Sequence, residues 1–139
     1  MTNVFTDQAA FMQAADQTTD RYNAEQTELY VNLMVEEFGE CCAAVSLEGF
    51  IGELTDLLVV TIGCLYSLGV DPQKAWNIVH TNNMSKLTDG RLLKREDGKV
   101  QKGPNYQPPN LVPLIEAIVG ITDDDLIKTE GELDEVPHE

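Results

Sequence analysis

Apolar residues recur at helical spacing along three long segments of the chain. The first segment runs from about residue 24 to 45, the second from about 50 to 68, and the third follows Asp71-Pro72 and reaches about residue 84. The second segment is apolar on nearly all sides, which is typical of a helix buried within a bundle or between subunits. The pattern therefore predicts an all-α fold.

Short polar signals mark where the helices begin and end. Thr6 is the expected N-cap of a short first helix that extends to about residue 15, and Gly69 is placed to end the third helix in the left-handed conformation. Asp71 caps the fourth helix, with Pro72 at its first position, where the missing N–H is tolerated. Trp76, inside that helix, is expected to lie in the core.

The helical pattern breaks at Leu87. Asp97-Gly98 is a two-residue hairpin signal between short apolar runs, residues 103–110 contain three prolines and must be irregular, and residues 111–119 favour a short amphipathic helix. We predict a helical bundle of four to five helices with a small hairpin or loop insertion after the fourth helix, assembling as an oligomer. Residues 1–121 would form this domain, and residues 122–139 an acidic, disordered tail.

Two pairs of carboxylates interrupt the apolar helices. Glu37 and Glu40 lie three residues apart, as do Glu53 and Asp56, so each pair shares one helix face. The glycines at positions 49 and 52 would permit a tight reversal that brings the pairs face to face. Two like charges roughly 4 Å apart repel by about 4 kcal/mol at an effective dielectric of about 20, so a cation or protons must neutralise such a cluster.

Either acidic pair alone is most simply a solvated helix face, because this spacing is common in acidic chains. The two pairs together, on helices long enough to pack against each other, favour a site instead. Oxygen ligands of this kind suit a hard divalent ion, Mg²⁺ or Mn²⁺. The sequence therefore predicts a metal site made by these two helices.

Two downstream segments accompany the acidic motif. The motif reads E-x-x-E, twelve residues, E-x-x-D, and it is followed by V-H-x-x-N-M-S-K at residues 79–86 and E-D-G-K-V-x-K-G-P-N-Y at residues 96–106. Over residues 5–118 the chain resembles the all-α MazG-like nucleoside triphosphate pyrophosphohydrolases, to which phosphoribosyl-ATP pyrophosphohydrolase is related. It is most similar to the small single-domain members of phages and bacteria.

The resemblance implies metal-dependent hydrolysis of a (deoxy)nucleoside triphosphate to the monophosphate and pyrophosphate. A purine deoxynucleotide such as dGTP is the substrate suggested by the likeness of residues 83–106 to phage forms. The metal, Mg²⁺ or Mn²⁺, would be held by four carboxylates: Glu37, Glu40, Glu53 and Asp56. The residues implied in catalysis are Glu36, Glu37 and Glu40, with Glu36 either in the metal shell or acting as general base.

A basic segment supplies the expected contacts to phosphate. Six of the nine Lys and Arg residues fall between residues 86 and 102, against three acidic ones, so the segment carries 6 − 3 = +3 in a chain of net charge −15. Such an island suits a small polyanion. The resemblance implies that Asn83 and Lys86 bind the substrate, and the basic island adds Arg91, Lys94 and Lys102 as candidate substrate-binding residues. Which of Arg91, Lys94, Lys99 and Lys102 reach the phosphates is left open by the sequence.

The remaining composition excludes other classes of partner. A net charge of −15 argues against nucleic-acid binding, where phosphate contacts dominate affinity. We find no apolar run that approaches the length of a membrane span and no basic signal-peptide start, so we expect a cytoplasmic protein, in the host cytoplasm if the chain is virus-encoded. Cys41, Cys42 and Cys64 lack disulfide or zinc spacing and are expected to be structural thiols.

Two other functions stay open. The chain could be a non-catalytic acidic helical interaction module that docks a basic partner through the same carboxylates. A di-iron carboxylate bundle would need Glu-x-x-His on two core helices, and this spacing occurs only at Glu135 and His138. No motif marks the residues that select the base, and a dimer and a tetramer are both compatible with the sequence.

Overall fold

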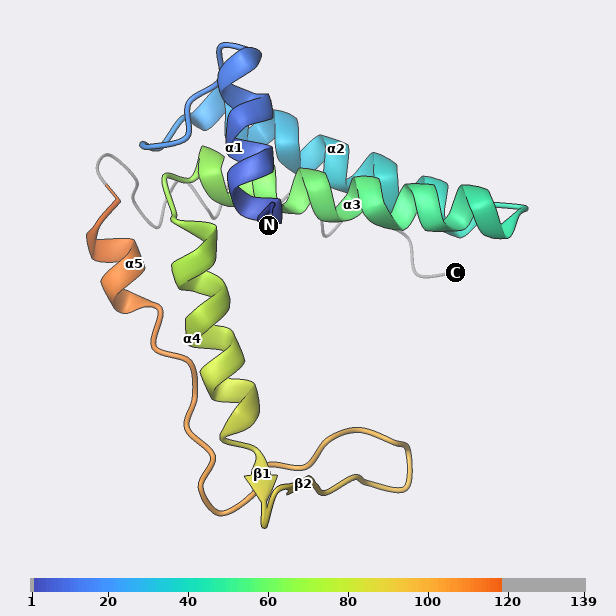
Figure 1. Ribbon diagram of the computed structural model, residues 1–139, viewed down its shortest axis with the longest axis vertical. Coiled ribbons are helices and arrows are strands. Elements are labelled where there is room, and N and C mark those ends of the chain that lie inside the picture. The colour runs from blue at the N-terminus through green and yellow to red at the C-terminus, as the bar shows by residue number, and fades with distance from the viewer. Residues whose placement is uncertain (1, 119–139) are drawn as a thin grey trace. The chain divides into compact units, whose positions relative to one another are not determined.

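The protein is described by a computed structural model that places residues 2–118. Within this range the chain forms five helices and one short hairpin, which are labelled in Figure 1. In chain order they are α1 (Val4–Ala14), α2 (Ala24–Ala43), α3 (Leu47–Ser67), α4 (Pro72–Met84), β1 (Leu87–Thr88), β2 (Arg91–Leu92) and α5 (Val112–Glu116). The predicted all-α class, with a small hairpin after the fourth helix, is confirmed. The predicted boundary after residue 121 and the predicted tail lie outside the described residues.

The chain forms two compact units. The first unit runs to Val70 and contains α1, α2 and α3, whereas the second, Asp71–Ala117, contains α4, β1, β2 and α5. Gly69 has a φ of 79° and ends α3, as predicted. The predicted metal ligands all belong to the first unit, and the basic segment belongs to the second.

Polar side chains cap the N-termini of the four long helices. Asn3, Asn23, Ser46 and Asp71 each accept a hydrogen bond from a backbone N–H of the following first turn, at 2.9–3.0 Å. Each satisfies a donor that the helix leaves unpaired. The prediction that Thr6 caps α1 is wrong: its hydroxyl lies inside the helix and donates to the Asn3 carbonyl oxygen at 2.9 Å.

α2 and α3 lie side by side and antiparallel (Figure 1) along a seam of heptad spacing. Seam residues on α2 follow one another at intervals of four, three, four and three, and α3 repeats these intervals in the opposite direction. Direct contacts join Gln26 with Ser67, Tyr30 with Gly63, and Glu40 with Glu53. The seam spacing places Leu33 opposite Val60 and Glu37 opposite Asp56. This spacing is that of a coiled-coil seam.

Two contacts at one end of the seam fix its register. The buried Gln26 side chain donates through Nε2 to Ser67 Oγ at 2.8 Å. One turn further, the Tyr30 ring lies against Gly63 so closely that a Cβ at this glycine would overlap the ring. Tyr30 is 3% exposed, and its hydroxyl donates to Gln17 Oε1 at 2.7 Å. The glycine is therefore required by the close approach of the two helices.

The chain reverses between α2 and α3 at residues 44–46. Gly49 and Gly52 lie inside α3, so the prediction that they form the reversal is wrong. The extended backbone of Ser46 and its capping hydroxyl start the helix earlier than the glycines would suggest. A long helix with a packed face tolerates the cost of a glycine, about 1 kcal/mol each.

The core of the first unit is small and joins all three of its helices. Met12 of α1, Tyr30 of α2 and Val60 of α3 are buried against one another. The Tyr66 hydroxyl donates to the backbone oxygen of Phe5 at 3.0 Å, which ties α1 to the C-terminal part of α3. α1 is therefore held against α3 by both packing and a hydrogen bond.

The N-terminal half of α3 exposes much of its apolar surface. Large exposed side chains occupy its N-terminal half: Leu47, Phe50, Ile51, Leu54 and Leu58. The expectation that this helix is buried within the bundle is wrong for the single chain, because α1 and α2 cover only part of it. Its burial between subunits stays a prediction.

By length and composition α3 could also cross a membrane, so the expectation that no apolar run approaches this length is wrong. Only 17% of its most apolar 18-residue window is buried. One such helix is weak evidence, because core helices of soluble proteins meet the same criteria. Glu53 and Asp56 lie along its length, and each charge would cost about 3 kcal/mol at the centre of a bilayer.

The second unit contains an exposed aromatic pair. Trp76 is 59% exposed, so the expectation that it lies in the core is wrong. Its ring stacks on His80 one turn later on α4, with the ring centroids 6.3 Å apart and the planes within 5° of parallel. Helical periodicity indicated the face that these residues share, but not whether another element covers that face.

Both Asp-Gly pairs of the second unit turn the chain. Asp89-Gly90 connects β1 to β2, with φ of 50° and 73°, the conformation of a type I′ turn. The predicted turn at Asp97-Gly98 is also present, between Lys94 and Val100, which form an isolated antiparallel bridge. The earlier hairpin was missed because its strands have only two residues each.

We expect Gly63→Ala to lower the free energy of unfolding by about 1–3 kcal/mol, because the added methyl group overpacks the contact with Tyr30. Chemical denaturation measures this change. Gly52→Ala is the matched control, since it lies on the same helix with open space around its Cβ, and it should raise stability by up to about 1 kcal/mol. Equal stabilities of the two variants would contradict the assigned contact.

Candidate metal centre

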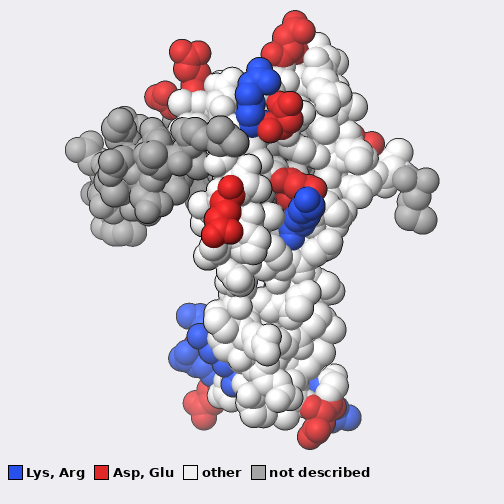
Figure 2. Space-filling view, turned by 90° about the vertical axis from the view of Figure 1, so that its left-hand side faces the viewer, with Lys and Arg blue, Asp and Glu red and all other residues white. Residues whose placement is uncertain are grey.

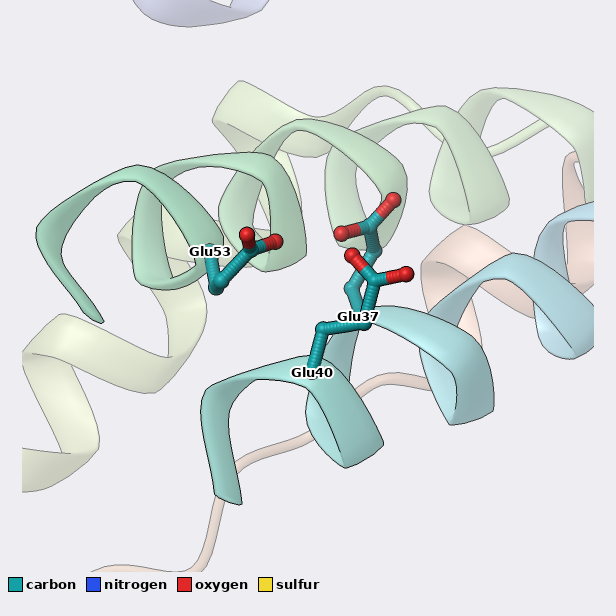
Figure 3. Close-up of side chains that lie close together, drawn as sticks. All are labelled: Glu37, Glu40 and Glu53. Carbon is teal, nitrogen blue, oxygen red and sulfur yellow. The ribbon is translucent and has the colours of Figure 1, made fainter. Parts of the chain in front are cut away.

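Three carboxylates converge between α2 and α3. Glu37 and Glu40 project from α2 and Glu53 from α3, and one oxygen of each lies within 4.8 Å of the others (Figure 3). Glu37 and Glu53 are partly buried and Glu40 is exposed, so the cluster lies at the surface. The structure thus brings together three of the four predicted metal ligands.

The helix register explains this convergence. Glu37 and Glu40 occupy the two seam positions that follow Leu33, and the same seam on α3 places Asp56 and Glu53 opposite them. Asp56 lies outside the group of three converging oxygens, but its charge acts on both Glu37 and Glu40. The two acidic pairs recognised in the sequence therefore occupy one end of the packed seam between α2 and α3.

The carboxylates disfavour one another's ionisation. The pKa of Glu37 is raised by loss of solvation and then by the charges of Glu40, Asp56 and Glu36. The pKa of Glu40 is raised by a hydrogen bond with Glu53, followed by the charge of Glu53 and by loss of solvation. The hydrogen bond with Glu53 and the neighbouring negative charges therefore favour the protonated form of Glu40.

Basic side chains are nearly absent from residues 2–70, which carry the acidic cluster. Among residues 2–70 the sequence has no Lys and a single Arg, Arg21, which precedes α2 and pairs with the adjacent Asp20 at 3.4 Å. Within residues 2–70, neutralisation of the cluster is therefore left to protons or to a bound cation. Three carboxylates that can each supply one oxygen to a common point fit a hard divalent ion such as Mg²⁺ or Mn²⁺.

Comparison with known families agrees with this geometry. A family model described as phosphoribosyl-ATP pyrophosphohydrolase matches residues 8–83, which is more than half of the chain. The chain belongs to the phosphoribosyl-ATP pyrophosphohydrolase family. It is therefore a hydrolase of the pyrophosphohydrolase kind that acts on a nucleotide. Members of this family typically depend on a divalent metal, as the acidic cluster would require.

The family match covers the acidic cluster but not the basic segment. Residues 8–83 extend from α1 through α4, so Asn83 is the last residue matched and Lys86 lies beyond it. A search among curated proteins finds no match to the chain. The family match therefore says nothing of the segment from Lys86 to Lys102.

The predicted phosphate-binding residues lie in the second unit. Lys86 Nζ donates to Asn83 Oδ1 at 2.8 Å, so these two side chains act together at the end of α4. Arg91 and Lys94 are exposed, and Lys102 Nζ lies 4.6 Å from the centre of the Tyr106 ring. Figure 2 shows Lys and Arg side chains gathered on the surface of this unit, with a few acidic side chains among them.

The cysteines are free thiols, as expected. Burial raises the pKa of Cys41, with a further contribution from the charge of Glu53, and burial also raises the pKa of Cys64. Both thiols are therefore less reactive than an ordinary cysteine. Cys42 is exposed, so packing does not explain it.

A cavity beside the acidic cluster was not predicted from the sequence. A cavity of about 490 Å³ lies between α1 and α3, and Asp56 forms part of its wall. The helices that form it are separated in sequence by α2, so only the packing of α1 against α3 creates it. No residue pattern along the chain could have indicated it.

The raised pKa values predict that the metal-free protein loses stability as the pH rises. In the folded protein the pKa values of Glu37 and Glu40 are raised above the ordinary value of 4.5. The contribution of their protonation to the free energy of unfolding is therefore fully present below pH 4.5, and it is lost as the pH rises through the raised folded values. In chelator, the melting temperature should therefore fall from mildly acidic to neutral pH. Glu40→Gln should flatten this dependence and raise the melting temperature at neutral pH.

Addition of Mg²⁺ or Mn²⁺ at neutral pH should restore the melting temperature of the wild type but not shift that of Glu40→Gln to the same extent. Glu28→Gln, an exposed change on the same helix, is the control for altered net charge. A wild-type melting temperature that is independent of pH in chelator would contradict the electrostatic conflict in the cluster.

Proposed function

We propose that the protein hydrolyses a (deoxy)nucleoside triphosphate to the monophosphate and pyrophosphate in a reaction that depends on Mg²⁺ or Mn²⁺. A purine deoxynucleotide such as dGTP is the proposed substrate. The convergence of Glu37, Glu40 and Glu53 in a chain of the pyrophosphohydrolase family is the observation that carries this proposal. The choice of dGTP rests on the resemblance of residues 83–106 to phage forms.

The reaction breaks one bond of the triphosphate. The oxygen of a water molecule attacks the α-phosphorus, the bond from this phosphorus to the bridging oxygen breaks, and pyrophosphate leaves with that oxygen. A divalent ion held by Glu37, Glu40, Glu53 and Asp56 would polarise phosphate oxygens and lower the pKa of bound water. Glu36 would take the proton of the attacking water, since it adjoins the cluster on α2 without belonging to the converging group.

The basic segment is proposed to neutralise the departing pyrophosphate. Lys86, already oriented by its hydrogen bond to Asn83, would contact the β and γ phosphates. Arg91, Lys94 and Lys102 would add further positive charge. Asn83 would hold the substrate together with Lys86. All of these side chains belong to the second unit.

We also propose that the protein is a homo-oligomer, a dimer or a tetramer, located in the cytoplasm and free of membrane and nucleic acid. The exposed apolar half of α3 supports this, because a second copy would remove it from water. The acidic surface disfavours nucleic acid. Analytical ultracentrifugation tests the assembly: a mass of 15.4 kDa would rule it out.

The reaction is tested by measuring pyrophosphate release from the eight common NTPs and dNTPs, with Mg²⁺, Mn²⁺ or chelator. We expect metal-dependent release with a monophosphate product, fastest for a purine deoxynucleotide. Glu40→Gln should lower kcat at least about 100-fold with the fold retained, because it removes a ligand and a charge from the cluster. Glu28→Gln, on the same helix, should leave the rate unchanged.

The opposite results would identify which part of the proposal fails. An active Glu40→Gln enzyme would show that the cluster is not the catalytic centre. Release that persists in chelator would exclude a required metal. No release from any nucleotide by the folded, metal-loaded protein would favour a different diphosphate substrate or the alternative of an acidic interaction module.

A further inference from the structure

The cavity between α1 and α3 has the size and the walls of a ligand pocket. Its volume of about 490 Å³ lies within the range of about 300–1,000 Å³ that small-molecule sites occupy. Its apolar wall includes Val4 and Phe11 from α1, and Leu58 and Ile62 from α3. Phe11 is 64% exposed and Leu58 is 51% exposed, so apolar groups surround the entrance. Such walls suit a flat, weakly polar ring.

The cavity adjoins the acidic cluster. Asp56 lines the cavity, and the same carboxylate lies close enough to Glu37 and Glu40 to raise the pKa of both. The cavity and the acidic cluster therefore have Asp56 in common, and Asp7 adds a second carboxylate to the cavity wall. A molecule with a polyanionic part and an apolar ring could occupy both places at once, the anionic part through a bound cation.

Gln8 is the buried polar side chain in the cavity wall. It is 6% exposed, and its Nε2 atom has no hydrogen-bond partner among the described residues. The Gln8 side chain interacts with the Tyr30 hydroxyl and lowers the pKa of Tyr30. A buried amide nitrogen that lacks a hydrogen-bond acceptor is nevertheless unfavourable. A primary amide offers a donor and an acceptor side by side, which is the pattern that pairs with the edge of a base such as adenine.

We propose that this cavity receives the nucleobase of the substrate, with Phe11 and Leu58 against the ring and Gln8 hydrogen-bonded to its edge. The proposal rests on the proposed function, since the triphosphate is what would place the base beside Asp56. It assigns base selection to α1 and α3 of the first unit, where no sequence motif marked it. Gln8 is then the specificity-determining residue, and the apolar walls supply affinity for any base.

Filling the entrance tests the pocket. Leu58→Trp should raise KM for every nucleotide at least about tenfold, while Mn²⁺ binding stays at the wild-type level. Leu29→Trp is the matched control, because this leucine of α2 is 46% exposed and does not line the cavity. Equal KM values for the two variants would overturn the proposal.

Changing the amide tests specificity separately. Gln8→Leu should narrow the ratio of kcat/KM between the best and the worst base by about tenfold or more, because a group that pairs with the base edge is lost. Hydrolysis of 2-deoxyribose 5-triphosphate, which lacks a base, should be unaffected by Gln8→Leu and by Leu58→Trp. The role of Gln8 would be overturned if Gln8→Leu left the kcat/KM ratios between bases unchanged. It would also be overturned if kcat/KM fell equally on the substrate that lacks a base.

Binding of the four 2′-deoxynucleosides in chelator, followed by NMR, separates the pocket from the reaction. The wild type should bind at least one of them, and Leu58→Trp should not, whether or not the protein hydrolyses nucleotides. If turnover is absent but this binding is present, the proposed function fails and the pocket stands. If no deoxynucleoside binds, the proposal is wrong. It is also wrong if Leu58→Trp leaves deoxynucleoside binding unchanged and alters only the mass of the protein in solution, because the cavity then belongs to an interface between copies.

Discussion

The contact between Tyr30 and Gly63 determines how α2 and α3 align. The ring of Tyr30 fits only where α3 lacks a side chain, so the helices cannot slide past one another by a turn without a steric clash. Seven residues separate Tyr30 from Glu37, and seven separate Gly63 from Asp56. Two helical turns from the contact, the seam therefore brings the acidic pairs together.

The seam divides into a half that stabilises the fold and a half that carries chemistry. Around Tyr30 the facing positions are filled by buried side chains, with Met12 of α1 packed over them. In the other half the same positions hold four carboxylates, and the neighbouring charges help to raise the pKa values of Glu37 and Glu40. Arg21, the one basic residue among residues 2–70, is engaged by Asp20. The protein thus gives up packing at these positions, and a divalent cation would remove the resulting electrostatic conflict.

Local signals in the sequence were sufficient for the helix class and for the acidic pairs. Asp71-Pro72 and Gly69 indicated the correct boundaries because capping depends on neighbouring residues only. The prediction that Thr6 is the N-cap of α1 is wrong because Thr and Asn both cap helices well, and the backbone geometry selects Asn3.

Features that depend on what covers a helix face could not be predicted. Periodicity grouped Trp76 and the apolar residues in the N-terminal half of α3 with a core, but in the single chain these side chains are exposed. A lone glycine such as Gly63 does not indicate which side chain it faces. The cavity beside Asp56 requires α1 to cross α3, and those two helices are not adjacent in the sequence.

Direct titration of Mn²⁺ is the measurement that tests the central claim most closely, because it reports on the carboxylate cluster without any assumption about substrate. The wild type should bind the ion, and Glu40→Gln and Glu53→Gln should each weaken binding at least about tenfold. Glu48→Gln, which removes an acidic side chain from the first turn of α3, should bind like the wild type. Equal binding by all four proteins would contradict a metal centre at the seam.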